Sequence, residues 1–145
     1  MPELVTLDLE TIAEKVQEVL PAFPEVAGAY LFGSALGPCR PDSDIDLGLI
    51  VDDSRVPVSP HDPLRREREE ERIAMALGYI QGHPFHVTIL DSDEAIFSFR
   101  AVASGRLVYL RDEPLLTTFL ERVALRYRET HPRYMRALHE IAEGV

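Results

Sequence analysis

Two aspartates that are two positions apart carry the clearest chemical signal in this sequence. Asp44 and Asp46 lie in the segment SDIDLGLIV, in which the remaining residues from 45 to 51 are apolar or glycine. If residues 45–51 form a β-strand, both carboxylates point to one face and the large apolar side chains point to the other. Neighbouring carboxylates repel each other unless a cation lies between them. The spacing therefore predicts a site for a hard divalent cation such as Mg²⁺.

A glycine-serine turn precedes the acidic pair. The segment VAGAYLF, residues 26–32, has the composition of a strand, and it stops at Gly33 and Ser34. Glycine lets backbone amides approach a ligand, and a helical turn that begins here would add the positive end of its dipole. The turn is therefore a candidate seat for phosphate, with the Ser34 hydroxyl as a further donor. The turn and the acidic pair together predict a site for a metal-bound nucleoside triphosphate.

The combined segment GSALGPCRPDSDIDL, residues 33–47, resembles the signature of the nucleotidyltransferase superfamily. That signature is Gly-Ser, a loop, and Ser-Asp-x-Asp-Leu on the next strand. The short chain and its later segments HVTILD and SGRLVYL resemble the minimal nucleotidyltransferases, which are often antitoxin partners of helical HEPN toxins. The resemblance extends over residues 26–125. It implies that Asp44 and Asp46 are catalytic carboxylates that bind Mg²⁺, or Mn²⁺ in its place, and that the nucleotide is ATP.

The resemblance implies a third catalytic carboxylate, but this sequence has a histidine in its place. In the family it lies on a neighbouring strand with an apolar-Asp-apolar-apolar pattern, and the segment PFHVTIL places His86 at that position. A neutral imidazole is a poorer ligand for Mg²⁺ than a carboxylate, suits Mn²⁺ or Zn²⁺ better, and can act as a general base. Asp91 lies at an odd offset from His86 and forms a helix-capping pattern with Glu94. We expect His86 to line the site, and the alternative is an ordinary hydrogen-bonded histidine of the sheet.

The loop after Gly33 departs from the family pattern as well. Members often have one more residue before the next glycine and commonly an arginine beside it, whereas here Leu36 directly precedes Gly37. The loop thus keeps its turn but lacks that cation, and Arg40 is the substitute for neutralising a triphosphate. The predicted nucleotide contacts are Gly33, Ser34, Arg40 and Ser43.

Composition excludes several other classes of protein. A length of 145 residues favours a single domain, 1–145, and a net charge of −10 argues against bulk binding of nucleic acid. The single cysteine, Cys39, excludes an internal disulfide framework and a cysteine metal cluster. The sequence has no long apolar run, and its N-terminus MPELVTLDLE is acidic, so neither a membrane span nor a signal peptide is predicted. We expect a cytoplasmic protein.

Helices and strands alternate along the chain. Apolar spacing predicts a helix over 9–20, capped by Thr6 or Asp8, and the two strands that carry the site are close enough in sequence to be antiparallel neighbours. The fold class is α+β, a small mixed β-sheet flanked by helices, and the resemblance implies the nucleotidyltransferase fold of the polymerase-beta palm. The further predicted elements are a loop that could act as a flap at 52–63, a helix with a solvated, charged first half at 64–82, a strand at 84–90, a helix from the Asp91 cap to Gly105, a strand at 106–110, a helix from Asp112, and a last short helix after Pro132.

Two functions remain open at this point. The resemblance implies a transferase that moves AMP from ATP to a hydroxyl of a partner protein, most directly a HEPN-type toxin. Alternatively, His86 weakens catalysis and the chain neutralises such a toxin by binding alone. The helices after residue 112 could either pack on the core or present apolar residues to that partner.

Overall fold

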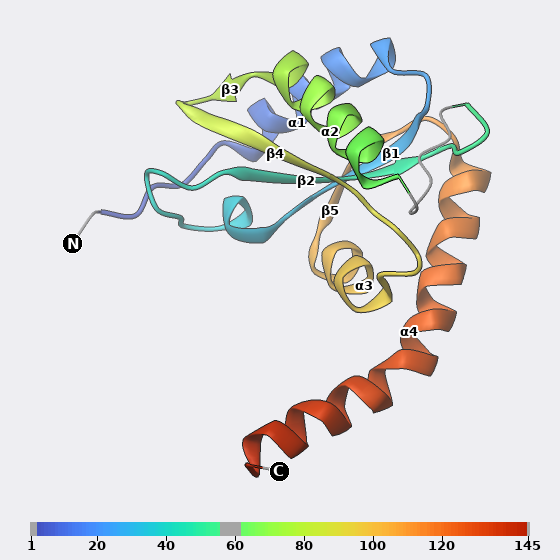
Figure 1. Ribbon diagram of the computed structural model, residues 1–145. Helices are drawn as coiled ribbons and strands as arrows, with labels where there is room; N and C mark the ends of the chain where they lie inside the picture. The colour runs from blue at the N-terminus through green and yellow to red at the C-terminus, as the bar shows by residue number, and fades with distance from the viewer. Residues whose placement is uncertain (1–2, 56–61, 145) are drawn as a thin grey trace.

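The computed structural model describes residues 3–55 and 62–144 (Figure 1). The middle of the predicted flap, 56–61, lies outside the described residues. The elements are α1 (Leu9–Val19), β1 (Val26–Phe32), β2 (Ile45–Val51), α2 (Pro63–Leu77), β3 (Tyr79–Ile80), β4 (His83–Ile89), α3 (Ala95–Ser104), β5 (Arg106–Leu110) and α4 (Glu113–Ala142), with short 3₁₀ helices at Leu20–Ala22 and Gly33–Leu36.

One mixed sheet organises the chain. Its strand order is β3-β4-β2-β1-β5. β1 pairs with β2 and with β5 in the antiparallel sense, whereas β2 and β4 are parallel, because α2 lies in the connection between them. The predicted α+β class and the antiparallel pairing of β1 with β2 are confirmed.

The two faces of the sheet are covered differently. Helices α1 and α2 lie on one face, which we call the α1–α2 face, and α3 and the first half of α4 lie on the other, the α3–α4 face (Figure 1). The period-two alternation of the strands sends alternate residues to each side. The α1–α2 face carries Ala29, Leu31, Ile45, Leu47, Leu49, Phe85, Val87 and Ile89, and the α3–α4 face carries Tyr30, Phe32, Asp46, Gly48, Ile50, His86 and Leu90.

The main core fills the α1–α2 face. Ile12 and Val16 of α1 and Ile73 of α2 are at most 1% exposed and pack on the strands. α1 begins at the predicted cap Asp8, whose carboxylate accepts hydrogen bonds from the N–H groups of Glu10 and Thr11. Full burial of each such aliphatic side chain contributes about 1.5–3 kcal/mol. This layer therefore provides most of the apolar burial that holds the strands in register.

The predicted helix over 64–82 is too long. α2 ends at Leu77, because Gly78 adopts a φ of +73° and turns the chain into the short strand β3. Its acidic and basic side chains form ion pairs, as predicted for a solvated face, but Arg66 and Glu70 also bind the end of β4. The charge run therefore has a structural role as well.

The predicted capping box of Asp91 and Glu94 is wrong. Glu94 is the N-cap residue of α3 and makes no side-chain cap bond. The Asp91 carboxylate instead accepts a hydrogen bond from the N–H of Asp93, and the Glu94 carboxylate lies 3.2 Å from Arg66. The ion pair with α2 competes with the local cap and takes the Glu94 side chain away from the helix end.

The predicted break at Pro132 does not occur. α4 is one continuous helix from Glu113 to Ala142 with Pro132 inside it, and Figure 1 shows that it bends and runs away from the sheet. A proline within a helix removes one hydrogen bond and is accommodated by bending. Within the described ranges, none of the helices combines the length and the apolar character needed to cross a lipid bilayer.

Candidate functional site

Asp46 is the centre of the site. It lies near the start of β2 on the α3–α4 face, and its side chain is 29% exposed. The sheet register places Phe32 of β1 beside it on one side and His86 of β4 on the other. Phe32 in turn packs edge-on against Phe97 of α3, with ring centroids 5.8 Å apart. Asp46 therefore lies at the boundary between the covered and the uncovered parts of this face.

His86 is bonded to Asp46. Its Nδ1 lies 3.1 Å from Asp46 Oδ1, and its side chain is 64% exposed. Because an ionised carboxylate only accepts hydrogen bonds, this contact places the hydrogen on Nδ1 and leaves the lone pair of Nε2 free. The structure brings together two of the three predicted catalytic residues as a carboxylate-oriented imidazole.

Gly33 closes the site on another side. It has a φ of +78°, and a Cβ atom built at this position would lie 2.5 Å from Asp46 Oδ2. Any side chain here would displace the carboxylate in addition to straining the backbone. The 3₁₀ helix Gly33–Leu36 begins at this glycine and is the helical turn considered in the sequence analysis, and Ser34 is exposed. The Gly-Ser turn and the Asp46 strand are therefore in direct contact.

Asp44 is exposed and immediately precedes β2. The peptide before it is held by His83, whose Nδ1 lies 2.7 Å from the carbonyl oxygen of Ser43 and whose side chain is buried. Further back, Cys39 exchanges two backbone hydrogen bonds with Val5. Asp44 thus extends from a loop that is fastened at two points.

His83 is a positioning residue that the sequence did not indicate. It follows a Gln81-Gly82 turn and lies at the first residue of β4, where no periodicity or motif singles it out. Only the parallel pairing of β4 with β2 brings it beneath the loop that precedes Asp44. The role of His83 depends on the tertiary structure, so the local sequence could not have predicted it.

Arg40 forms an ion pair with an exposed carboxylate of the same loop in this structure. Its Nε lies 3.2 Å from Asp42 Oδ1, and the two side chains are 67% and 74% exposed. Such an exposed pair holds its partners weakly, at about 0.2–1 kcal/mol. Arg40 can therefore exchange Asp42 for a more highly charged anion at little cost.

The donors at this site suit a divalent cation in type but do not form a closed cage. Asp44 and Asp46 offer carboxylate oxygens of the kind that Mg²⁺ binds, and His86 adds a nitrogen. Across residues 3–55 and 62–144, no group of three or more histidine, cysteine or acidic side chains is arranged to hold a metal ion. A cation here would need further ligands from outside these three side chains.

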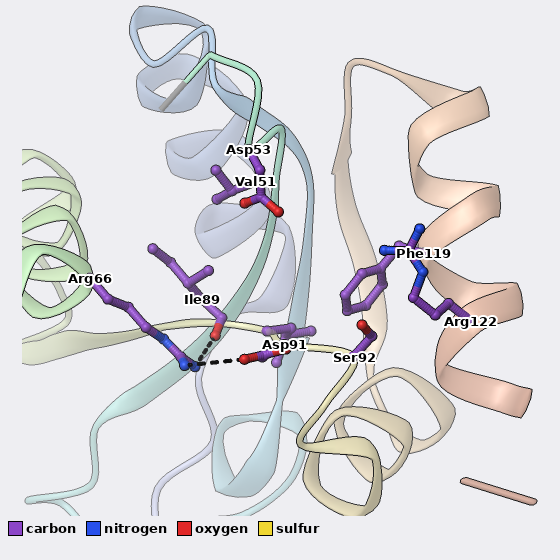
Figure 2. Close-up of a pocket in the computed structure, with 9 residues that line it drawn as sticks. Val51, Asp53, Arg66, Ile89, Asp91, Ser92, Phe119 and Arg122 are labelled. Atoms are coloured by element: carbon purple, nitrogen blue, oxygen red, sulfur yellow. Dashed lines mark hydrogen bonds and ion pairs between the residues drawn. The ribbon is translucent and has the colours of Figure 1, made fainter. Parts of the chain in front are cut away.

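A separate charged pocket of about 70 Å³ lies at the opposite end of β2 and β4 (Figure 2). Arg66 there contacts the Ile89 carbonyl and Asp91, while Phe119 and Arg122 enter from α4. Burial, then the nearby carboxylates of Asp91 and Asp52, raise the pKa of Asp53 above its usual range. This pocket joins α2, the sheet and α4, and it contains none of the predicted site residues.

The sequence profile described as "Polymerase beta, Nucleotidyltransferase" matches residues 14–114, a span that includes the Gly33 turn, Asp44, Asp46 and His86. The chain belongs to this nucleotidyltransferase family. A search of curated protein sequences gives no significant match.

Solved structures share the fold of this nucleotidyltransferase. One is a complex described as tri-AMPylated Shewanella oneidensis HEPN toxin with MNT antitoxin: the TM-score is 0.64 at 17% identity, over 93% of this chain and 99% of the matched one. A toxin-antitoxin complex with AMP-PNP matches with a TM-score of 0.59 at 18% identity, over 90% and 98% of the two chains. A third, described as toxin-antitoxin MntA-HepT, has a TM-score of 0.58 at 16% identity, over 92% and 98%. The predicted nucleotidyltransferase fold and the likeness to minimal nucleotidyltransferases are confirmed.

Proposed function

We propose that this nucleotidyltransferase moves AMP from ATP to a hydroxyl group of a partner protein, as an antitoxin of a HEPN-type toxin does. The observation that carries the proposal is the contact of the Asp46 carboxylate with both Gly33 and His86. One element can seat phosphate and the other can accept a proton, and they meet at the same carboxylate. Family membership and the fold shared with toxin-antitoxin complexes give further support.

The proposed reaction assigns each group a role. The hydroxyl oxygen of the acceptor attacks the α-phosphorus of ATP, the bond from that phosphorus to the bridging oxygen breaks, and pyrophosphate leaves. His86 Nε2 accepts the hydroxyl proton, since Asp46 holds Nδ1 and so fixes the tautomer. The Gly33 turn and Ser34 hold triphosphate oxygens, with Ser43 and Arg40 as the further predicted contacts.

Asp44 and Asp46 are the proposed ligands of Mg²⁺, with Mn²⁺ as the alternative. When bound, the ion neutralises charge on the phosphates. The two oxygens of Asp46 face different neighbours, because Oδ1 contacts His86 and Oδ2 lies against Gly33. Asp46 can thus orient the imidazole while its carboxylate remains part of the phosphate site.

The alternative function rests on one observation at the same place. His86, where the family has a carboxylate, occupies Asp46 Oδ1 with its ring nitrogen. A cation site that loses one negative charge binds its ion more weakly. A chain weakened in this way would neutralise a HEPN-type toxin by binding alone.

Transfer assays separate these functions. The chain is incubated with a HEPN-type toxin encoded beside it, Mg²⁺, and ATP labelled at either the α or the γ phosphate. AMP transfer leaves only the α label on the toxin, and His86→Ala should reduce the rate by about 100-fold or more, the usual range for loss of a general base. A wild type that is inactive and gains transfer in His86→Asp would establish the binding-only function.

Nucleotide binding gives an independent test of the cation site. Calorimetry of ATP binding with and without Mg²⁺ should show a metal dependence that Asp44→Ala abolishes. If ATP binds equally in all of these cases, the proposed cation site is wrong. If neither His86→Asp nor His86→Ala alters transfer or binding, His86 does not line the site.

A further inference from the structure

The outer edge of β4 is open beside His86. β3 pairs with β4 only at Tyr79–Pro84 and Ile80–His83, so from Phe85 onward β4 has no neighbouring strand on that side among the described residues. Open strand edges present unpaired backbone donors and acceptors that can pair with another chain. The hydrogen bonds of neighbouring residues show which backbone groups of β4 point toward this open edge.

The backbone of Val87 faces outward, away from β2. The N–H of Leu90 donates inward to the Leu49 carbonyl of β2, whereas the N–H and carbonyl of Ile89 bind outward to Glu70 and Arg66 of α2. Because the direction alternates along a strand, the backbone groups of Val87 point outward like those of Ile89. No residue in 3–55 or 62–144 forms a hydrogen bond with them. α2 thus closes the edge at Ile89 and leaves it open at Val87.

A hollow of about 450 Å³ lies along this open edge. Residues of β4 form one wall, and residues of α2 form the other. A second hollow, of about 360 Å³, continues toward β3 past Met75 and Tyr79, whose side chains are 83% and 69% exposed. The first is lined by Glu67, Glu70, Glu71, Ala74, Phe85, His86 and Val87, and Ala74 and Phe85 also line the second. Together they form one groove with an acidic end beside His86 and an apolar end beside Tyr79.

The acidic end favours cationic side chains. Three glutamates line it, and burial raises the pKa of Glu70 even though that carboxylate accepts the Ile89 N–H and lies near Arg66. Glu67 and Glu71 are exposed and form no ion pair with any described residue. A lysine or arginine that enters the groove would therefore meet uncompensated negative charge.

We propose that this groove binds an extended acceptor segment of the partner protein, which adds to β4 as an edge strand, and that the segment has a hydroxyl residue flanked by lysine or arginine. This inference rests on the proposed transfer to a protein hydroxyl. Residues opposite each other on adjacent strands share a face and lie about 4.5–5.5 Å apart at Cβ. A residue level with His86 therefore presents its hydroxyl on the α3–α4 face, beside Nε2. Its two neighbours point to the opposite face, toward Glu67 and Glu71.

The segment is further specified by the apolar end of the groove. Backbone pairing supplies affinity that does not depend on sequence, while alternate side chains supply specificity. An apolar residue beyond the basic one would contact Met75 and Tyr79. The groove thus selects a flexible, basic segment of the partner over its folded surface.

Binding of synthetic peptides tests the charge preference without nucleotide. A fluorescent nine-residue peptide with Arg-Tyr-Arg at its centre should bind the full chain, as measured by anisotropy, and the same peptide with Glu-Tyr-Glu should not. The double substitution Glu67→Lys with Glu71→Lys should weaken binding of the basic peptide by roughly tenfold or more. Glu121→Lys with Glu129→Lys changes the net charge equally on exposed residues of α4 and should leave binding unchanged. Equal losses in the two double variants would overturn the proposal.

Backbone methylation tests strand addition itself. Only alternate residues of an added strand direct their N–H toward β4, so N-methylation of one alternate set should abolish binding and methylation of the other should be tolerated. If binding is unchanged by methylation of either set, or is lost equally with both sets, strand addition is excluded. Because these measurements need no ATP, a chain that binds the peptide but transfers no AMP refutes the transferase and leaves the groove established. A chain that modifies its toxin but ignores the peptide refutes only the groove.

Discussion

The two faces of the sheet differ in what their strands carry and in how completely they are covered. On the α1–α2 face, Ile45, Leu47 and Leu49 of β2 are fully buried beneath α1 and α2. On the α3–α4 face, the same strand carries Asp46, which stays partly exposed between the turn and His86. A single seven-residue strand thus holds the apolar core on one side and the candidate chemistry on the other.

This difference has a physical basis. A carboxylate is costly to bury, so it must lie where helices leave the sheet uncovered, while its position is fixed by the packed side chains on the reverse of the same strand. Rigid support on one face allows a polar site on the other to keep its geometry. Substitutions on the two faces should therefore have separable effects.

The largest effect is expected from Leu47→Ala. Truncation of this fully buried residue should reduce the free energy of unfolding by about 2–5 kcal/mol, because it leaves a cavity beneath α1 and α2. Urea denaturation measures the loss, and Leu125→Ala, at a residue that is 53% exposed on α4, is the control. ATP affinity of the folded fraction should stay near the wild-type value. A loss of affinity without a loss of stability would contradict the separation of the faces.

Asp46→Ala should lower activity and leave stability nearly unchanged, the reverse of what is expected for Leu47→Ala. AMP transfer should fall about 100-fold or more, since loss of even an outer ligand in a metal site costs 10–100-fold. The free energy of unfolding should change by less than about 1 kcal/mol, because the contact with exposed His86 is only partly buried. Glu14→Ala removes an exposed carboxylate of α1 and should leave transfer near the wild-type rate. If Asp46→Ala unfolds the protein, Asp46 is a structural residue.

Gly33→Ala should affect stability and the site together. The added Cβ meets Asp46 Oδ2 and the residue must keep a φ of +78°, so we expect a loss of about 1–2 kcal/mol in stability together with weaker ATP binding. Gly37→Ala is the matched control, since a Cβ there has nothing within 4 Å. Thermal melts and calorimetry on both variants make the comparison. Full ATP affinity in Gly33→Ala would show that the turn serves the backbone alone.

The smallest effect is expected from Glu70→Gln at the edge of β4. Burial raises the pKa of Glu70 above its ordinary value of 4.5, so protonation stabilises the fold below that value and this stabilisation is lost as the pH rises through the folded-state pKa. The uncharged glutamine can still accept the Ile89 N–H. Glu70→Gln should therefore be slightly more stable than wild type at neutral pH, and the difference should vanish in urea titrations below pH 4.5. A variant that is less stable at neutral pH would show that the ion pair with Arg66 outweighs burial.

The sequence predicted the strands of the site because their signals are local. The strand-like composition of VAGAYLF, the position of Asp46 between Ile45 and Leu47 in IDLGLIV, and the Gly33-Ser34 stop between the two segments predict the first two strands, and the short connection predicts their antiparallel pairing. Errors arose where distant groups compete with local preference. Glu94 pairs with Arg66 of α2 in place of capping α3, and α4 continues through Pro132 although proline usually ends a helix.

By itself, the sequence determined the α+β class, the turn and the aspartate pair, and it predicted that His86 stands at the family's third acidic position, because each depends on the period of a strand or on a short motif. Only the tertiary structure decided that Asp46 contacts both Gly33 and His86, that His83 holds the carbonyl of Ser43, and that the edge of β4 is open at Val87 among the described residues. These features depend on the parallel register of β2 with β4 and on where α2 ends. Both are set by packing of the whole core, and no short segment of the chain encodes them.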